Sequence, residues 1–244
     1  MHEIPRQILI KLPTLWGVDL SITNEVLLLW IAAAVTFTLV TLACRRSSPV
    51  AKGPFQNFFE ALVDFVDESI GAEILGQQGR RWAPFLLTLF FFILFSNLLG
   101  LIPLPSHFKA MTSSINVSAA LALIVFILTL IVNIRTHGTL GFLKKFSPSG
   151  IPLVVKILAI PIEVVSWLAR PLSLAIRLCA NMMAGHALIL VFLGMAGSAA
   201  WLLKPLPYAG AVIMSAFELF VSFVQAFIFT LLAGMYIKDA LDEH

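Results

Sequence analysis

Long uncharged apolar stretches are the feature that most constrains this chain. Residues 26–44 read VLLLWIAAAVTFTLVTLAC and contain no charged side chain. About 20 apolar residues are enough for a helix to cross the hydrocarbon core of a bilayer. Hydrophobic residues make up 59% of the 244 residues and charged residues only 12%, against about 25% charged in an average soluble domain. The sequence therefore predicts an all-α polytopic membrane protein built as a single membrane domain.

Five segments are long enough and apolar enough to cross a membrane. The predicted crossings are residues 26–44, 82–103, 115–134, 151–203 and 206–237. The last two exceed the length of one perpendicular span, so we expect strongly tilted or bent helices there. Between them stands WLLKPLP, in which Lys204, Pro205 and Pro207 are turn signals. The last two crossings should therefore form an antiparallel hairpin.

Lysine and arginine are distributed unevenly between the two sides of the membrane. One side collects Arg45, Arg46, Lys52, Arg80, Arg81, Arg135, Lys144, Lys145 and Lys238. The other side collects Arg6, Lys11, Lys109 and Lys204. Short loops rich in these residues stay in the cytoplasm. We therefore expect the N-terminus outside and the C-terminus in the cytoplasm.

An amphipathic helix is predicted over residues 54–75, between the first two crossings. Its apolar side chains keep helical spacing and are Phe55, Phe58, Phe59, Leu62, Val63 and Val66. The acidic side chains on its other side are Glu60, Asp64, Asp67 and Glu68. The segment is either a cytoplasmic-surface helix that touches a partner or a structural hairpin with a solvated acidic face.

Several classes of protein are excluded by the absence of their motifs from the sequence. There is no phosphate-binding loop, dinucleotide fingerprint, metalloprotease helix or nucleophile elbow. The two cysteines, Cys44 and Cys179, match no metal-ligand spacing and are too few for a disulfide framework. We expect no cofactor, no metal and no nucleic-acid partner, so any chemistry must come from ionisable residues inside the membrane.

Ionisable side chains recur every seven residues in the fourth predicted crossing. They are Lys156, Glu163, Arg170 and Arg177. Seven residues turn an ideal helix through almost two full turns, so the four side chains share one stripe. A stripe of this kind facing lipid would be costly, so it must face protein or water. Lys156 and Arg170 are able to extend to the membrane surface or to pair with Glu163.

Arg177 is harder to account for as an ordinary structural residue. Residues 178–203 carry no formal charge, and its own helix offers no acidic neighbour within reach. Arginine stays protonated, so it cannot lower the cost of burial by losing its charge. Ser173 and Asn181, four residues to either side, continue the polar stripe. We therefore expect a functional role for Arg177, with its counter-charge on another helix or another subunit.

The last crossing carries Glu218 and Gln225, which are seven residues apart and share one face. In an antiparallel hairpin that turns near residues 201–202, His186 lies level with Glu218 and Arg177 lies level with Gln225. Histidine titrates near neutral pH, and burial favours the uncharged form of a carboxylate. His186 and Glu218 are therefore predicted to form a proton path.

The two level pairs conflict with the geometry of an ideal helix. Arg177 and His186 are nine residues apart, which places them on opposite faces. Either Gly185 marks a distortion of the helix or the two pairs line different surfaces. The sequence leaves both alternatives open.

These residues stand in motifs that resemble a known family. PLSLAIRLCANMMAGH (171–186) and FELFVSFVQAFIFTLLAGMYI (217–237) closely resemble the membrane-embedded a subunit of rotary F-type ATP synthases. NLLGLIP (97–103), SINVSAALAL (114–123) and the tail DEH (242–244) are similar to the second span, third span and end of bacterial members. Nearly the whole chain is covered, so a bacterial plasma membrane is the expected location.

The resemblance implies a non-catalytic stator subunit in a multisubunit ATP synthase. Its partners would be a rotating ring of c subunits, the b subunit of the peripheral stalk and the lipid bilayer. Two offset aqueous half-channels would carry protons to and from the ring. Arg177 would face the essential carboxylate of each passing c subunit, and this coupling of ion flow to rotation would drive ATP synthesis.

Further roles are implied residue by residue. Asn181 and Gln225 match the polar neighbours of the arginine, and His186 and Glu218 match the outer half-channel pair. The remaining matches, to the inner channel and to an asparagine of the third span, are Ser173, Glu163 and Asn116.

The sequence departs from some bacterial members at one pair of positions. Those members have a carboxylate where this chain has His186 and a histidine where it has Glu218. The exchange keeps one of each group, so the two residues are expected to work as a unit.

A self-contained proton-coupled secondary transporter is the alternative function, although the odd number of spans and the lack of internal repeats disfavour it.

Overall fold

A computed structural model describes residues 8–10, 21–45, 53–101, 114–145, 153–198 and 200–242. Its elements are β1 (Ile8–Ile10), β2 (Ile22–Thr23), α1 (Asn24–Arg45), α2 (Pro54–Val66), the π-helical η1 (Asp67–Ala72), α3 (Glu73–Leu75), the 3-10 turn η2 (Gly76–Gln78), α4 (Gly79–Leu101), α5 (Ile115–Lys145), α6 (Leu153–Ser198) and α7 (Pro205–Leu241). The predicted all-α polytopic class is confirmed. The antiparallel pairing of the short strands β1 and β2 was not predicted.

Four helical stretches are long and apolar enough to cross a membrane. They are Gln56–Leu101, Ile115–Thr139, Lys156–Ser198 and Pro205–Leu241. A shorter apolar helix, Val26–Thr41, lies where the first crossing was predicted. Predicted crossing residues 102–103, 151–152 and 199 lie outside the described residues, as do Glu243 and His244 of the acidic tail. The third helix continues past its predicted end at residue 134 to Lys145, with a kink at Gly138, where φ is 71°.

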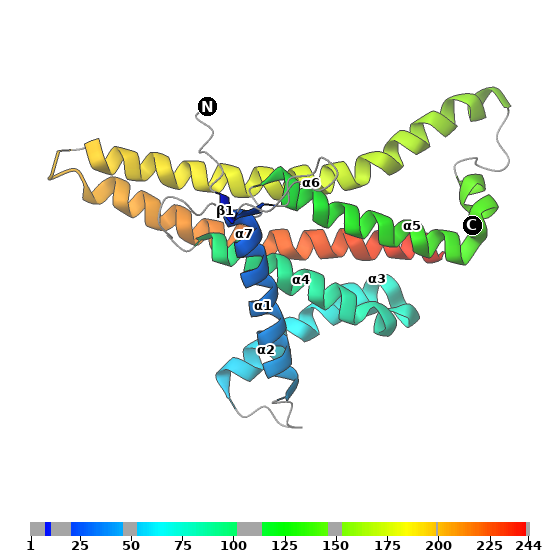
Figure 1. Ribbon diagram of the computed structural model, residues 1–244, viewed down its shortest axis with the longest axis horizontal. Helices are drawn as coiled ribbons and strands as arrows, with labels where there is room; N and C mark the ends of the chain where they lie inside the picture. Colours follow the sequence, from blue (N-terminus) through cyan, green and yellow to red (C-terminus); the bar gives the residue numbers. More distant parts are fainter. Residues whose placement is uncertain are drawn as a thin grey trace.

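The helices α6 and α7 form the predicted antiparallel hairpin. They run side by side along the longest axis of the molecule (Figure 1), and α6 ends at Ser198 before α7 begins at Pro205. The turn therefore falls where Lys204 and Pro205 indicated it. Both helices run across the direction of α1 (Figure 1). The hairpin is strongly tilted relative to α1, as expected for tracts longer than one perpendicular span.

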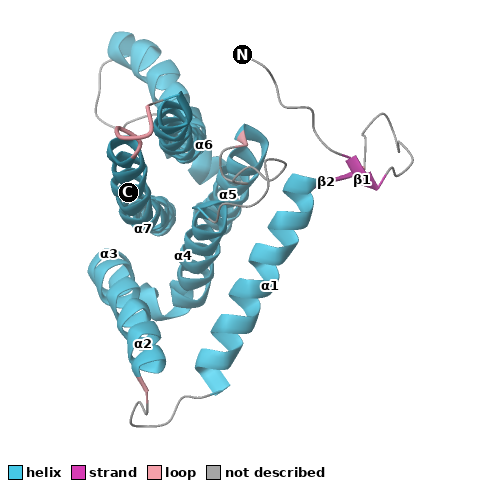
Figure 2. Ribbon diagram, turned by 90° about the vertical axis from the view of Figure 1, so that its left-hand side faces the viewer, coloured by secondary structure: helices cyan, strands magenta, loops and turns pink. Residues whose placement is uncertain are grey.

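The segment after α1 folds as a second helical hairpin, in which α2, η1 and α3 run out and α4 returns (Figures 1 and 2). Gly76 turns the chain with φ 53° and ψ −122°, a backbone conformation that favours glycine. The two arms touch where a Cβ at Gly79 would collide with the carbonyl of Gly71. This arrangement agrees with the second interpretation of residues 54–75. The four side chains of the predicted acidic face all stay exposed; they are Glu60, Asp64, Asp67 and Glu68.

The core joins both hairpins. Phe59, Val66 and Ile70 from the first arm are buried against Phe90 and Phe91 of α4 and a face of α7. The approach to α7 is close, because a Cβ at Gly234 would lie 2.8 Å from Cγ2 of Ile70. The rings of Phe59 and Phe91 stack with their centroids 5.2 Å apart. This packing makes α4 and α7 the central pair of helices.

The helix α6 is the least covered of the long helices. Only 11% of the most apolar stretch of α6 is buried, against 44% for the corresponding stretch of the segment that includes α4. The main contacts of α6 are with α5 and α7, and most of its other side chains are exposed. The fold therefore presents one long apolar helix face with few neighbours among the described residues.

Candidate functional site

His186 and Glu218 meet across the α6–α7 hairpin, as predicted. Nδ1 of His186 lies 2.6 Å from Oε1 of Glu218. Nε2 of His186 lies 2.9 Å from the carbonyl oxygen of Gly100, near the end of α4. The glutamate side chain is only 3% exposed, whereas the histidine side chain is 28% exposed. The pair thus joins a buried carboxyl group to an imidazole that is partly open.

The two contacts of the imidazole restrict how protons are placed on the pair. A carbonyl oxygen can only accept a hydrogen bond, so Nε2 of His186 must carry a proton. A neutral histidine then accepts at Nδ1, which requires a protonated Glu218 as donor. A charged histidine instead donates from both nitrogens, which fits an ionised Glu218. Either way the short His186–Glu218 contact holds one proton that the two groups can exchange.

Gly185 makes this contact possible. A Cβ at this position would lie 2.7 Å from both the carboxyl carbon and Oε1 of Glu218. A separation this short is a clash, so only glycine leaves room for the carboxyl group beside α6. Helix α6 continues without a non-helical residue at Gly185; the glycine allows close approach, His186 contacts α7 and α4, and Arg177 is exposed.

A second polar contact lies further along the hairpin. Nδ2 of Asn181 donates to Oε1 of Gln225 over 2.8 Å. Gln225 was predicted to lie level with Arg177, but in the structure Asn181, one turn further along α6, makes the contact instead. The difference is mainly a shift along the helix axis, because residues four apart on an α-helix share nearly the same face and are separated by about 6 Å of rise.

Buried polar atoms continue from this contact into α4. Nδ2 of Asn97 donates to the carbonyl of Ser222 over 3.3 Å, and Asn97, Ser222 and Gln225 are all buried. Within the described part of the chain, one polar atom of each has no hydrogen-bond partner, and the same holds for nearby Ser96 Oγ and Glu218 Oε2; the three atoms are Asn97 Oδ1, Ser222 Oγ and Gln225 Nε2. Buried polar atoms in proteins are normally satisfied, often by water. The α4–α7 contact therefore has the polar lining that internal water needs.

Arg177 lies on the open surface of α6. Its side chain is exposed, and among the described residues its guanidinium has no hydrogen-bond or ion-pair partner. This agrees with the expectation that its counter-charge lies elsewhere. Ser173 is also exposed, one turn before it.

Glu163 and Asn116 are not brought to these contacts. Both side chains are exposed, Glu163 on the first half of α6 and Asn116 in the first turn of α5. Within the described residues, neither forms a hydrogen bond with His186, Glu218 or Gln225. The contacts within the α6–α7 hairpin therefore give no support to the roles predicted for Glu163 and Asn116.

Comparison with known proteins shows the family to which the chain belongs. Residues 26–238 match the sequence profile described as ATP synthase A chain. The chain belongs to this family. The protein named ATP synthase subunit a from Magnetococcus marinus is 42% identical over 230 residues, which are 93% of this chain and 87% of the relative. Those of Neorickettsia sennetsu and Mesorhizobium japonicum are 38% and 40% identical, covering 97% and 92% of this chain and 96% and 89% of the relatives.

In this member of the ATP synthase A chain family, the two motifs that indicated the family face each other. Residues 171–186 lie on α6 and residues 217–237 lie on α7. Their polar side chains form the His186–Glu218 and Asn181–Gln225 contacts. The motif residues thus converge on one hairpin.

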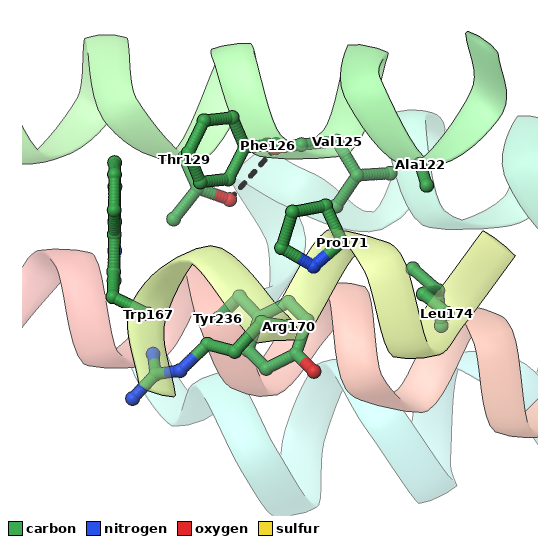
Figure 3. A pocket seen from close by; sticks show the side chains of 9 residues that line it. All are labelled: Ala122, Val125, Phe126, Thr129, Trp167, Arg170, Pro171, Leu174 and Tyr236. Atoms are coloured by element: carbon green, nitrogen blue, oxygen red, sulfur yellow. Dashed lines mark hydrogen bonds between the residues drawn. The ribbon is translucent and has the colours of Figure 1, made fainter. Parts of the chain in front are cut away.

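One ion pair of this family member was missed from the sequence. Nη1 of Arg170 donates to Oδ2 of Asp239 on α7 over 2.8 Å, so Arg170 does not pair with Glu163 as one alternative had it. Cζ of Arg170 also lies 5.4 Å from the ring centroid of Tyr236, and both side chains are drawn in Figure 3. The sequence did contain a sign of this ion pair. If Asn181 lies opposite Gln225 in the antiparallel hairpin, Arg170 lies within about one helical turn of Asp239.

Proposed function

We propose that this chain is the proton-conducting stator subunit of a rotary F-type ATP synthase in a bacterial plasma membrane. The observation that carries the proposal is Arg177, a permanent cation without a counter-charge among the described residues, on the least covered of the four long apolar helices. A cation held there calls for an anionic partner from outside the chain. The family of the chain supplies the kind of complex in which such a partner would be found.

The partner surface would be the ring of c subunits. An ionised carboxylate is costly in lipid, whereas a protonated one is tolerated. Arg177 stabilises the ionised carboxylate of the c subunit that faces it, so the proton leaves at this point. After rotation, the next carboxylate is reprotonated from the other side. The fixed charge of Arg177 also repels a free proton and so prevents direct leakage between the two sides.

The outer half-channel would run through the His186–Glu218 pair. Their shared proton and the unsatisfied polar atoms around Ser222 and Asn97 support this assignment. Asn181 and Gln225 would connect the pair to the neighbourhood of Arg177. The inner half-channel would be lined by Ser173 and Glu163, both exposed on α6, and Asn116 keeps its proposed role from the family match alone.

The wider assembly follows from the same proposal. The chain would be non-catalytic by itself and would be held beside the ring by the b subunit of the peripheral stalk. The charge distribution of the loops supports an N-terminus outside and a C-terminus in the cytoplasm. Each proton that crosses 100 mV releases about 2.3 kcal/mol, so several must pass for each ATP.

The test is Arg177→Ala in the assembled complex, reconstituted in vesicles, with ATP-driven proton pumping and passive proton leak recorded together. We expect pumping to be lost and passive leak to rise while the complex stays intact. Lys204→Ala is the matched control, because Lys204 is an exposed cation in the α6–α7 turn. Near-normal pumping by Arg177→Ala would refute the proposal.

A self-contained secondary transporter would behave differently. It would carry solute without partner subunits, whereas a stator subunit conducts in a coupled manner only with its ring. The purified chain in liposomes should therefore show no saturable proton-driven solute uptake. Such uptake would favour the transporter.

A further inference from the structure

The central part of α6 carries two formal charges, and the structure treats them differently. Residues 164–198 contain Arg170 and Arg177 as their charged side chains, about two turns or roughly 10 Å apart along the helix. Neither arginine can lose its charge. Within the described residues, Arg170 has a carboxylate partner and Arg177 has none.

The partner of Arg170 is held in surroundings that strengthen the pair. The side chains of Arg170 and Asp239 are 31% and 39% exposed, so most of each is covered. Arg170 lines one pocket together with aromatic side chains of three helices, Phe126 of α5, Trp167 of α6 and Tyr236 of α7 (Figure 3). Tyr236 lies beneath the guanidinium, and the rings of Trp167 and Phe126 contact each other with centroids 4.4 Å apart. Apolar neighbours reduce screening by water, so charge neutralisation matters more here than at an open surface.

We propose that Asp239 is a specificity-determining residue that neutralises Arg170, so that Arg177 alone presents an uncompensated charge in this part of α6. The inference rests on the proposed function, in which a mobile carboxylate of a partner must stop at one cation. A second free cation two turns away would offer that carboxylate a competing position. Asp239 removes the competitor without removing the arginine, whose side chain lines the pocket between α5, α6 and α7.

The simplest competing explanation is a clamp that only holds α6 against α7. The two explanations differ in what each single substitution leaves behind. Asp239→Asn leaves Arg170 as a permanent cation. Arg170→Gln leaves the carboxylate of Asp239, which can be protonated or hydrated. Neutralisation therefore predicts that Asp239→Asn is the more harmful change and that adding Arg170→Gln repairs it. A clamp predicts similar losses from both single changes and no repair.

The experiment measures ATP-driven proton pumping by the whole ATP synthase in vesicles, normalised to the amount of assembled complex. Asp239→Asn should lower pumping about tenfold, a factor within the usual range for coupled neighbouring residues. Arg170→Gln should lower it by less, and the double variant should return to within about twofold of the unmodified complex. Lys238→Gln is the matched control, since it removes an exposed charge next to Asp239 without touching the pair, and it should change nothing.

Three results would overturn the inference. The first is a double variant that pumps no better than Asp239→Asn, and the second is Asp239→Asn pumping normally. If Asp239→Asn does not assemble, the double variant decides: assembly and pumping support neutralisation, and failure to assemble is the third contrary result. Arg177→Ala in the same assay separates this inference from the proposed function, because its loss of pumping would leave the function standing even where the inference fails.

Discussion

At the scale of single residues, the site depends on how closely a carboxyl group can approach a helix. Gly185 leaves the space into which Glu218 fits, and His186 then reaches Glu218 on one side and the Gly100 carbonyl on the other. A hydrogen bond of this kind loses most of its strength when its partners separate by a few tenths of an ångström beyond the usual range. Proton exchange between His186 and Glu218 is therefore sensitive to the single methyl group that alanine would add at position 185.

Gly185→Ala should displace the Glu218 carboxyl group and lower coupled proton pumping by about tenfold, the equivalent of one buried hydrogen bond. The measurement is ATP-driven acidification in vesicles that contain the assembled complex. Gly194→Ala on the same helix is the control, because no atom lies within 4 Å of its added Cβ. Equal pumping by the two variants would contradict the role given to Gly185.

Because His186 and Glu218 share one proton, we expect that the two residue types can be exchanged between the two positions. His186→Glu alone places two carboxyl groups together, and Glu218→His alone places two imidazoles together. The double exchange restores one of each, although it gives up the bond to Gly100. We expect the double variant to pump several-fold faster than either single variant, about the effect of one restored hydrogen bond, and the same vesicle assay compares them. A double variant no better than the singles would show that the order of the two groups matters.

At the scale of elements, the packing of α4 depends on the turn that precedes it. Gly76 has φ 53° and ψ −122°, and the arms of the hairpin come into contact at Gly71 and Gly79 just beyond it. A side chain at Gly76 would be strained whatever space surrounds it. The strain would be felt in α4 and α7, since η1 packs on both.

Gly76→Ala should destabilise the first hairpin by about 1–3 kcal/mol, the usual cost of a non-glycine residue in such a backbone conformation. The midpoint of thermal unfolding of the detergent-solubilised protein reports the change. Gly53→Ala provides the comparison, because Gly53 has an extended φ of −165° and open space around it. A midpoint lowered equally by both substitutions would argue against strain at Gly76.

At the scale of the whole molecule, the helices are covered very unevenly. α4 and α7 are packed on several sides, whereas α6 keeps a long face open beside Arg177. α1 contacts α4 and stands away from α6 (Figure 2). In the proposed complex, the open face of α6 is the part that would be covered by the ring.

This difference predicts which positions become protected on assembly. Cysteines are introduced at Ile176 on α6 and at Phe37 on α1, which are 49% and 72% exposed, after replacement of Cys44 and Cys179. A lipid-soluble maleimide should label both in the isolated chain. In the whole complex, labelling at position 176 should fall several-fold more than at position 37, because protection scales with burial. Unchanged labelling at position 176 would place the ring elsewhere.

Much of this architecture follows from local properties of the sequence. Runs of apolar residues predict the long helices, because a helix satisfies its own backbone hydrogen bonds in lipid. Lys204, Pro205 and Pro207 indicate the hairpin turn, and equal rise per residue in the two helices then brings His186 level with Glu218. The charge of Arg177 and the lack of an acidic neighbour on its helix predict a free cation. All of these depend on spacing along one or two helices.

The remaining features depend on how each helix is placed against its neighbours and which other helix packs on it. The placement of α6 along α7 selects Asn181 rather than Arg177 as the partner of Gln225. The third helix that supplies the Gly100 carbonyl and Asn97 comes from far away in the chain. Asp239 lies 69 residues from Arg170 and meets it only after the hairpin closes. The sequence by itself thus determined the helices, the turn and the level of the polar groups, because these are set by local hydropathy and helix rise. The tertiary structure alone decided which of these groups touch, because side-chain contacts depend on the packing of several helices at once.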